Sequence, residues 1–177
     1  MRSKQKLIRH RVAARQSLDT LHLIDVENLC HGTVRAPRCA NLWGHYRRQV
    51  PVGPRDHIVV AASTPNAAAA FFVFPTNTRR IAVPARPDAA DLALLAAVEP
   101  DTMIRRYRRV VIASGDHLFA DLAECLHAVG KAPIQVVSDG TGVSAGLYRH
   151  CAELVRLPWE SARGSDAPAL AGSPTPR

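Results

Sequence analysis

Carboxylates follow three of the apolar segments of this sequence, and an amide accompanies the first of them. Asp25 ends the run LHLID, with Asn28 three residues later, and Asp116 follows the run VVIASG. Asp88 and Asp91 follow the run RIAVPARP. Carboxylate oxygens are hard ligands that suit Mg²⁺ or Mn²⁺, and such a metal can lower the pKa of a water and hold a phosphate. These side chains therefore indicate a metal-dependent phosphoester site, provided that the fold brings them together.

Short apolar segments rich in Val and Ile alternate with helical segments through most of the chain. We expect strands at residues 21–25, 57–62, 80–83, 110–113 and 134–138, and a last one at 154–157. We expect helices at residues 37–49, 65–74, 88–98, 117–129 and 143–150. Strands that alternate with helices form βαβ units, so the sequence predicts an α/β fold with a mainly parallel sheet of five or six strands and helices on both faces.

This topology places the acidic residues at one edge of the sheet, because each of them follows a strand and parallel strands end at the same edge. Ligands of an open parallel sheet bind at this edge, at the carboxyl ends of the strands. Like charges within a few ångströms repel, so one group must take up a proton unless a cation neutralises it. Asp88, Asp91, Asp116 and Asn28 also stand where helix caps belong, which is an ordinary structural explanation for each. Asp25 differs, since a carboxylate at the end of a buried strand needs a partner.

Three segments of the chain resemble the NYN domain, a branch of the PIN-like nucleases. They are LIDVENL, AADLALL and VVIASGDHLFADLAECLHAVGK, and the resemblance runs from about residue 21 to residue 157. It implies a Rossmann-like three-layer α/β/α fold that binds Mg²⁺ or Mn²⁺. It also implies a ribonuclease that hydrolyses RNA phosphodiester bonds, and we expect an endoribonuclease.

The resemblance also implies roles for individual residues. Asp25, Asp91 and Asp116 match the metal-binding aspartates of the family. Asn28 matches an asparagine that would orient a water or a phosphate oxygen. Ser114 matches the serine of the S-G-D motif and would support the carboxylates through hydrogen bonds.

One position departs from the family pattern. Many members carry a second aspartate two residues after S-G-D, and this chain has Leu118 there. Asp121 could compensate as a further metal ligand if its helix turns it inward, although a solvated position is the stronger expectation. Glu27 could support the site, but we expect it to face solvent. The loss of an acid puts a two-metal site and full activity in doubt.

The net charge of +8 arises mainly from an N-terminal arm that would suit a polyanion such as RNA, and we expect single-stranded RNA as the partner. Residues 1–15 contain no acid and six bases: Arg2, Lys4, Lys6, Arg9, Arg11 and Arg15. Arg86, just before Asp88, is a further candidate RNA contact. The arginine-rich segments 79–80 and 105–109 precede strands, so the topology places them at the opposite end from the acidic residues.

The length of 177 residues suits one domain, expected at residues 18–158 between a basic flexible arm at 1–17 and a disordered tail at 159–177. No apolar run is long enough to span a membrane, and we expect a cytoplasmic protein. Whether it forms a homodimer is left open. We expect Cys125 and Cys151 in the core. A zinc site of Cys30, His31, Cys39 and His45 is a weak alternative, because their spacing fits no standard finger.

Two other functions compete for the same residues. A PIN-like fold with a weakened acidic centre could bind RNA or a protein without cutting, and Leu118 favours that alternative. A haloacid-dehalogenase-type phosphatase would use Asp25 as nucleophile, but its first motif needs an aspartate where Glu27 stands. It also needs a lysine before the last motif, and none occurs between Lys6 and Lys131. The glycines of segment 139–146 have the wrong spacing for a dinucleotide-binding loop.

Overall fold

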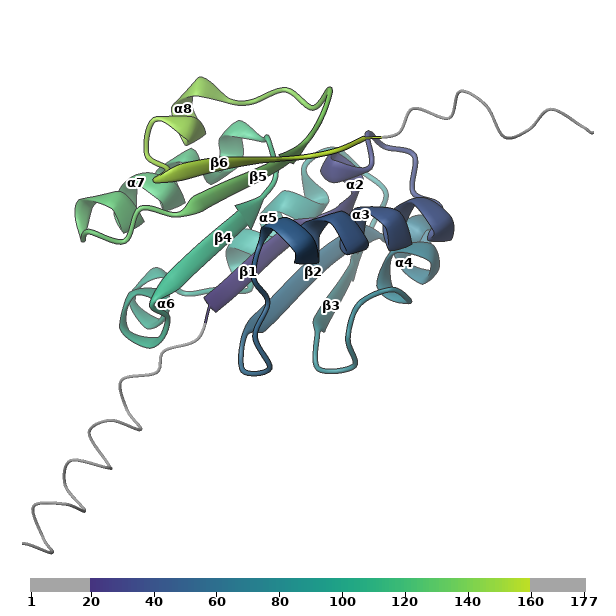
Figure 1. Cartoon of the computed structure of the whole chain (residues 1–177), viewed down its shortest axis with the longest axis horizontal. Coiled ribbons are helices and arrows are strands. Elements are labelled where there is room, and N and C mark those ends of the chain that lie inside the picture. Colours follow the sequence, from purple (N-terminus) through teal and green to yellow (C-terminus); the bar gives the residue numbers. More distant parts are fainter. Residues whose placement is uncertain (1–19, 160–177) are drawn as a thin grey trace, which may run out of the picture.

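Six parallel strands form one sheet in the computed structural model, which describes residues 20–159 (Figure 1). The strands are β1 (Thr20–Asp25), β2 (His57–Ser63), β3 (Arg79–Val83), β4 (Arg109–Ala113), β5 (Ile134–Ser138) and β6 (Glu153–Leu157). The expected arm at residues 1–17 and residues 160–177 of the expected tail lie outside the described residues.

Helices cover both faces of this sheet. They are α2 (Val26–Leu29), α3 (Ala36–Gln49), α4 (Thr64–Phe71), α5 (Ala89–Ala96), α6 (Pro100–Arg106), the 3₁₀ turn η1 (His117–Phe119), α7 (Ala120–Ala128) and α8 (Ala145–Tyr148). Leu23 and its neighbours on one face of the sheet pack with α5, α6, α7 and α8. Ile24 and its neighbours on the other face pack with α3 and α4. Alternate residues of a strand point to opposite faces, so β1 contributes to both cores and the three-layer α/β/α prediction is confirmed.

The strand order is β3-β2-β1-β4-β5-β6, which is the order of a doubly wound sheet. β1 pairs with β2 on one side and with β4 on the other. The chain reverses its direction of winding between β1 and β4, and the connections leaving these two strands diverge to opposite faces. A crevice opens there at the carboxyl ends of the strands, which is where ligands of such sheets bind. Asp25 ends β1 at this point, and Asp116 follows β4.

The predicted strands match the observed ones to within one residue at each end, whereas the helices match less closely. The short α2 and the whole of α6 were not predicted as helices. α4 ends at Phe71, so residues 72–74 of the predicted helix are wrong. Cys125 is exposed rather than in the core, and Cys151 is half-buried. No helix within residues 20–159 is long and apolar enough to cross a membrane.

The arginine-rich segments lie as the topology predicts, since Arg79 begins β3 and Arg109 begins β4. They therefore stand at the amino-terminal edge of the sheet, opposite the acidic residues. The guanidinium of Arg80 donates hydrogen bonds to backbone carbonyls of the segment that precedes β3, including that of Phe74 at 2.9 Å. This arrangement favours a structural role for Arg80.

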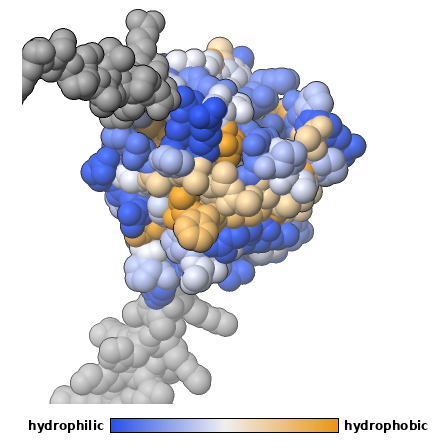
Figure 2. All heavy atoms as spheres, turned by 90° about the vertical axis from the view of Figure 1, so that its right-hand side faces the viewer, coloured by the Kyte–Doolittle hydropathy of each residue, from blue (hydrophilic) through white to orange (hydrophobic). Residues whose placement is uncertain are grey.

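Apolar side chains gather on the face formed by α3 and the end of α4 (Figure 2). A shallow groove of about 500 Å³ lies there between Ala36, Trp43, Phe72 and neighbouring residues. Phe72 is 87% exposed at its rim. No carboxylate lines this groove, so it is separate from the predicted metal site.

Two leucines of α5 test how this helix is held. Leu94 is fully buried in the core beneath the sheet, whereas Leu92 is 52% exposed on the same helix. Leu94→Ala should lower the free energy of unfolding by about 2–5 kcal/mol, because it removes buried contacts and leaves a cavity. Leu92→Ala should change it by less than about 0.5 kcal/mol. Urea unfolding of both variants measures the difference, and equal losses would contradict the packing described for α5.

Candidate metal centre

Asp25 is buried at the end of β1 and caps α2. Its Oδ1 accepts hydrogen bonds from the backbone N–H of Glu27 at 3.0 Å and of Asn28 at 3.1 Å. A buried carboxylate needs hydrogen-bond partners, and the backbone N–H groups at the start of α2 provide them for Asp25. Only 4% of Asp25 is exposed. Burial raises the pKa of Asp25, and the two backbone hydrogen bonds only partly oppose that effect.

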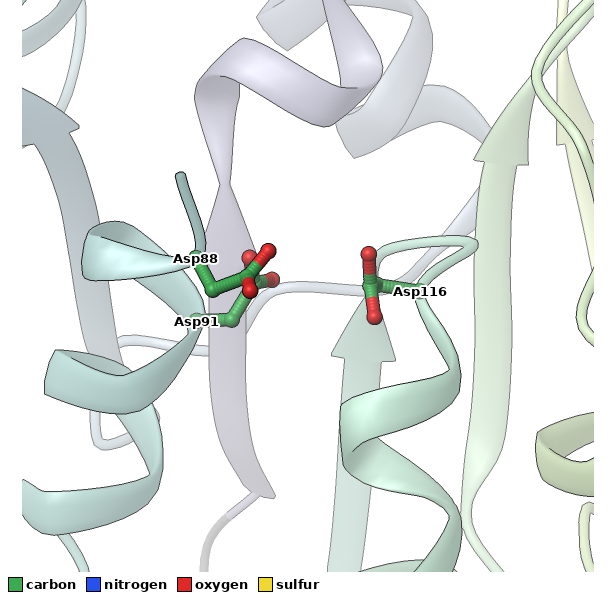
Figure 3. A group of neighbouring side chains, drawn as sticks. All are labelled: Asp88, Asp91 and Asp116. Carbon is green, nitrogen blue, oxygen red and sulfur yellow. The ribbon is translucent and has the colours of Figure 1, made fainter. Parts of the chain in front are cut away.

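Three other carboxylates converge beside it. Asp88, Asp91 and Asp116 each offer an oxygen that lies within 4.8 Å of the others (Figure 3). Asp88 and Asp91 come from the start of α5, and Asp116 faces them from the loop after β4 (Figure 3). Among the described residues this is the one group of three or more acidic, His or Cys side chains placed to hold a metal ion. The three aspartates could therefore bind a metal.

Asp88 does not act as the helix cap that its position suggests. It precedes α5 with a positive φ of 59°, and its side chain makes no capping hydrogen bond. A left-handed conformation is uncommon for a residue other than glycine, and such conformations cluster at functional sites. The carboxylate of Asp88 is thereby left exposed and directed at the other two (Figure 3).

Asp91 is the most constrained member of the group. It is 7% exposed, and its Oδ1 is buried without a hydrogen-bond partner. Burial raises the pKa of Asp91 to about 8, and the nearby charges of Asp25 and Asp116 add to the effect. A buried carboxylate oxygen without a donor is costly, so this atom needs either a proton or a cation.

A chain of hydrogen bonds fixes the loop that carries Asp116. The backbone N–H of Asp116 donates to Ser114 Oγ at 3.1 Å, and Asp116 Oδ1 accepts from the N–H of Leu118 at 2.9 Å. Gln135 on β5 donates its amide to the Ser114 carbonyl at 3.1 Å. Asp116 thus caps η1, but its half-exposed carboxylate also reaches the acidic group. Capping and a place in the group are compatible for this residue.

Asn28 connects the segment that follows β1 to the loop that follows β4. Its Oδ1 accepts from the N–H of Gly115 at 2.9 Å, so the side chain holds two loops rather than capping a helix. Asn28 and Asp116 line a cavity of about 330 Å³. The loop that carries Gly142 packs closely against Gly115. The carbonyl oxygen of Gly142 would lie 2.0 Å from a Cβ placed on Gly115. Only glycine allows this approach of the two loops.

Glu27 does not face solvent as expected. Its Oε1 accepts from Ser63 Oγ and from Asn66 Nδ2, both at 2.5 Å, and from the Ser63 N–H at 3.2 Å. Burial opposes ionisation, but these hydrogen bonds outweigh it and lower the pKa of Glu27. The glutamate anchors α2 to the end of β2. Ser63 and Asn66 belong to this support of the site, and no sequence signal linked them to Glu27.

The predicted site residues are thus mostly, though not entirely, brought together. Asp91 and Asp116 lie in one group as expected, whereas Asp25 stands beside Asp91 and outside that group. Asp88 is the third member of the group. Asp121 is exposed on α7 and does not join the group. Arg86 is exposed on the same edge, before Asp88.

The alternative zinc site is not assembled in the described part of the chain. Cys30 and Cys39 are buried with their sulfur atoms 3.9 Å apart. His31 instead contacts Ser138, and His45 contacts Arg48.

No known protein family matches the sequence, and no curated protein matches it. The resemblance to NYN domains therefore rests on the motif residues of the sequence alone.

The raised pKa of Asp91 predicts a pH-dependent stability in metal-free solution. Between about pH 4 and pH 8 the folded chain retains a proton that the unfolded chain releases, so the free energy of unfolding should fall as pH rises. Asp91→Asn should reduce this fall by at least ~1 kcal/mol. Urea unfolding with a chelator at several pH values measures it. Asp121→Asn, which changes an exposed acid, should follow the wild type, and identical profiles for all three proteins would contradict the burial of an ionisable Asp91.

The contact between Gly115 and Gly142 predicts unequal effects of two similar substitutions. Gly115→Ala should destabilise the chain by about 1–3 kcal/mol, because its Cβ would overlap a backbone carbonyl. Gly142→Ala places its Cβ in open space and should cost less than about 0.5 kcal/mol. Thermal unfolding of the two variants tests this, and a tolerated Gly115→Ala would show that the loops are not in close contact.

Proposed function

We propose that this protein is a metal-dependent ribonuclease of the NYN type, which hydrolyses RNA phosphodiester bonds with Mg²⁺ or Mn²⁺. The supporting observation is Asp91, whose buried Oδ1 lacks a hydrogen-bond donor and whose carboxylate offers an oxygen within 4.8 Å of oxygens of Asp88 and Asp116. A purely structural role does not explain why three like charges meet at the switch point of the sheet. A divalent cation would neutralise all of them at once.

The chemistry of the donors favours a hard cation. The group offers carboxylate oxygens and no sulfur or imidazole, which suits Mg²⁺ or Mn²⁺ better than zinc. When bound, such an ion supplies positive charge to a phosphate and acidity to a water. The mixture of buried Asp91 with more accessible Asp88 and Asp116 leaves one side of the group open to a substrate.

The chain's own residues would position the RNA. Asn28 uses its carbonyl oxygen on Gly115, which leaves its amide N–H groups to donate to a phosphate oxygen in the adjoining cavity. Arg86 is exposed near Asp88 and can neutralise a flanking phosphate. Ser114 keeps Asp116 in place through the backbone.

The position of Asp88 weakens the main argument for a non-cutting binding module. That argument is the absence of an acid at Leu118, which is half-buried. Asp88 supplies a third carboxylate from a different segment, so the group is not reduced to a pair.

The one lysine among residues 20–159, Lys131, does not favour the phosphatase alternative. Lys131 donates its ammonium to the backbone carbonyls of Ile104 and Tyr107, the latter at 2.7 Å. These carbonyls precede β4, so Lys131 lies at the opposite edge of the sheet from Asp25.

Cleavage of labelled single-stranded RNA tests the proposal. Wild-type protein should cut with Mn²⁺ and stop with a chelator. Asp91→Asn and Asp116→Asn should each lower the cleavage rate at least ~100-fold, because the electrostatic contribution of a metal is worth several kcal/mol.

Asp121→Asn is the matched control, since it removes an equal charge outside the group, and it should cut at the wild-type rate. Binding of RNA by every protein with cleavage by none would instead support a binding module. Equal cleavage by wild type and Asp91→Asn would point to a contaminating nuclease.

A further inference from the structure

A pair of stacked rings lies at the same edge of the sheet as the carboxylates. His31 follows α2, and Trp159 follows β6. Their ring centroids are 4.5 Å apart with an interplanar angle of 23°, and the guanidinium carbon of Arg38 lies 5.5 Å from the Trp159 ring centroid. Trp159 is half-buried and His31 is exposed. The pair joins residues far apart in the sequence, and it presents an imidazole to solvent.

The imidazole of His31 is held in place from its edge. Its Nε2 lies 2.9 Å from Ser138 Oγ and 3.3 Å from Thr141 Oγ1, and Ser138 in turn donates to the Leu29 carbonyl at 2.7 Å. His31 has a positive φ of 51°, which is uncommon outside glycine. Gly140 leaves room beside the ring, because a Cβ there would lie 3.1 Å from His31 Cε1. The ring is therefore fixed and kept accessible.

The stacked pair is connected to the acidic group. Thr141, which contacts His31, also lines the 330 Å³ cavity together with Asn28 and Asp116. The cavity thus borders Asp116 of the acidic group and Thr141, the neighbour of His31. A phosphate bound beside Thr141 in the cavity would have the His31 ring on the other side of that residue.

We infer that the His31–Trp159 pair stacks a base of the single-stranded nucleic acid whose backbone passes the carboxylates, an inference that rests on the proposed function. Every base has a planar face that stacks on aromatic rings, whichever its identity, and a guanidinium beside the rings adds to this attraction. In a duplex these faces are covered by neighbouring base pairs. The pair therefore selects single strands and imposes little sequence preference.

Binding of two strands of equal length tests this inference without any cleavage. One is a labelled single-stranded RNA, and the other is an abasic strand with the same number of phosphates, both measured by fluorescence anisotropy with a chelator present. His31→Ala should weaken binding of the base-bearing strand by roughly 5- to 100-fold and leave binding of the abasic strand unchanged. His31→Phe keeps a ring and should restore most of the affinity.

His127→Ala is the matched control, because His127 is also exposed and paired with a ring, that of His150 at 5.8 Å, but lies at the end of α7. It should bind both strands as the wild type does. The wild-type protein should itself bind the base-bearing strand at least about fivefold more tightly than the abasic strand, which tests the inference even if His31→Ala fails to fold.

Equal affinity of the wild type for the two strands, or an equal effect of His31→Ala on both, would overturn the inference. Its failure is distinguishable from that of the proposed function. A chain that binds bases through His31 but never cuts RNA would contradict the nuclease alone. A metal-dependent nuclease whose binding ignores His31 would contradict the stacking alone.

Discussion

The repulsion among carboxylates at the switch point is the constraint on which the rest of the site depends. Asp91 cannot turn away into solvent, because it is buried in the first turn of α5, and Leu94 of the same helix is packed in the core. Asp88 lies beside it at the start of α5, and Asp116 faces both from the loop after β4 (Figure 3). Burial and neighbouring charge together raise the pKa of Asp91 to about 8. Either a proton or a cation must therefore accompany the fold near neutral pH.

The surrounding hydrogen bonds make sense as the means of holding this arrangement against that repulsion. Asn28 links α2 to Gly115, Gln135 supports Ser114, and Glu27 anchors α2 to the end of β2. None of these contacts neutralises a carboxylate of the group. They instead keep the loops in place, so that the charge remains to be balanced by a ligand. His31 follows the same short helix α2 and contacts Thr141 in the loop after β5.

Much of this fold could be predicted from the sequence, because strands covered on both faces are apolar throughout and stand out from their neighbours. Asp25, Asp91 and Asp116 could be placed at one edge because parallel strands end together. Asp88 could be placed at this edge too, but its position as the third carboxylate of the group, in place of Asp25, could not be predicted, and nor could the contacts of Glu27. The first depends on a left-handed backbone and the second on partners in β2 and α4, and neither leaves a local pattern. α6 was missed because Pro100–Arg106 is short and has little apolar periodicity.

Anomalous diffraction from crystals soaked in Mn²⁺ tests the central claim most directly, because it locates the cation without depending on any substrate. We expect one anomalous peak within about 2–2.5 Å of carboxylate oxygens from Asp91 and at least one of its two partners. Crystals of Asp91→Asn should lack that peak. A wild-type crystal above pH 8 with saturating Mn²⁺ and no peak among the three aspartates would contradict the proposed metal centre.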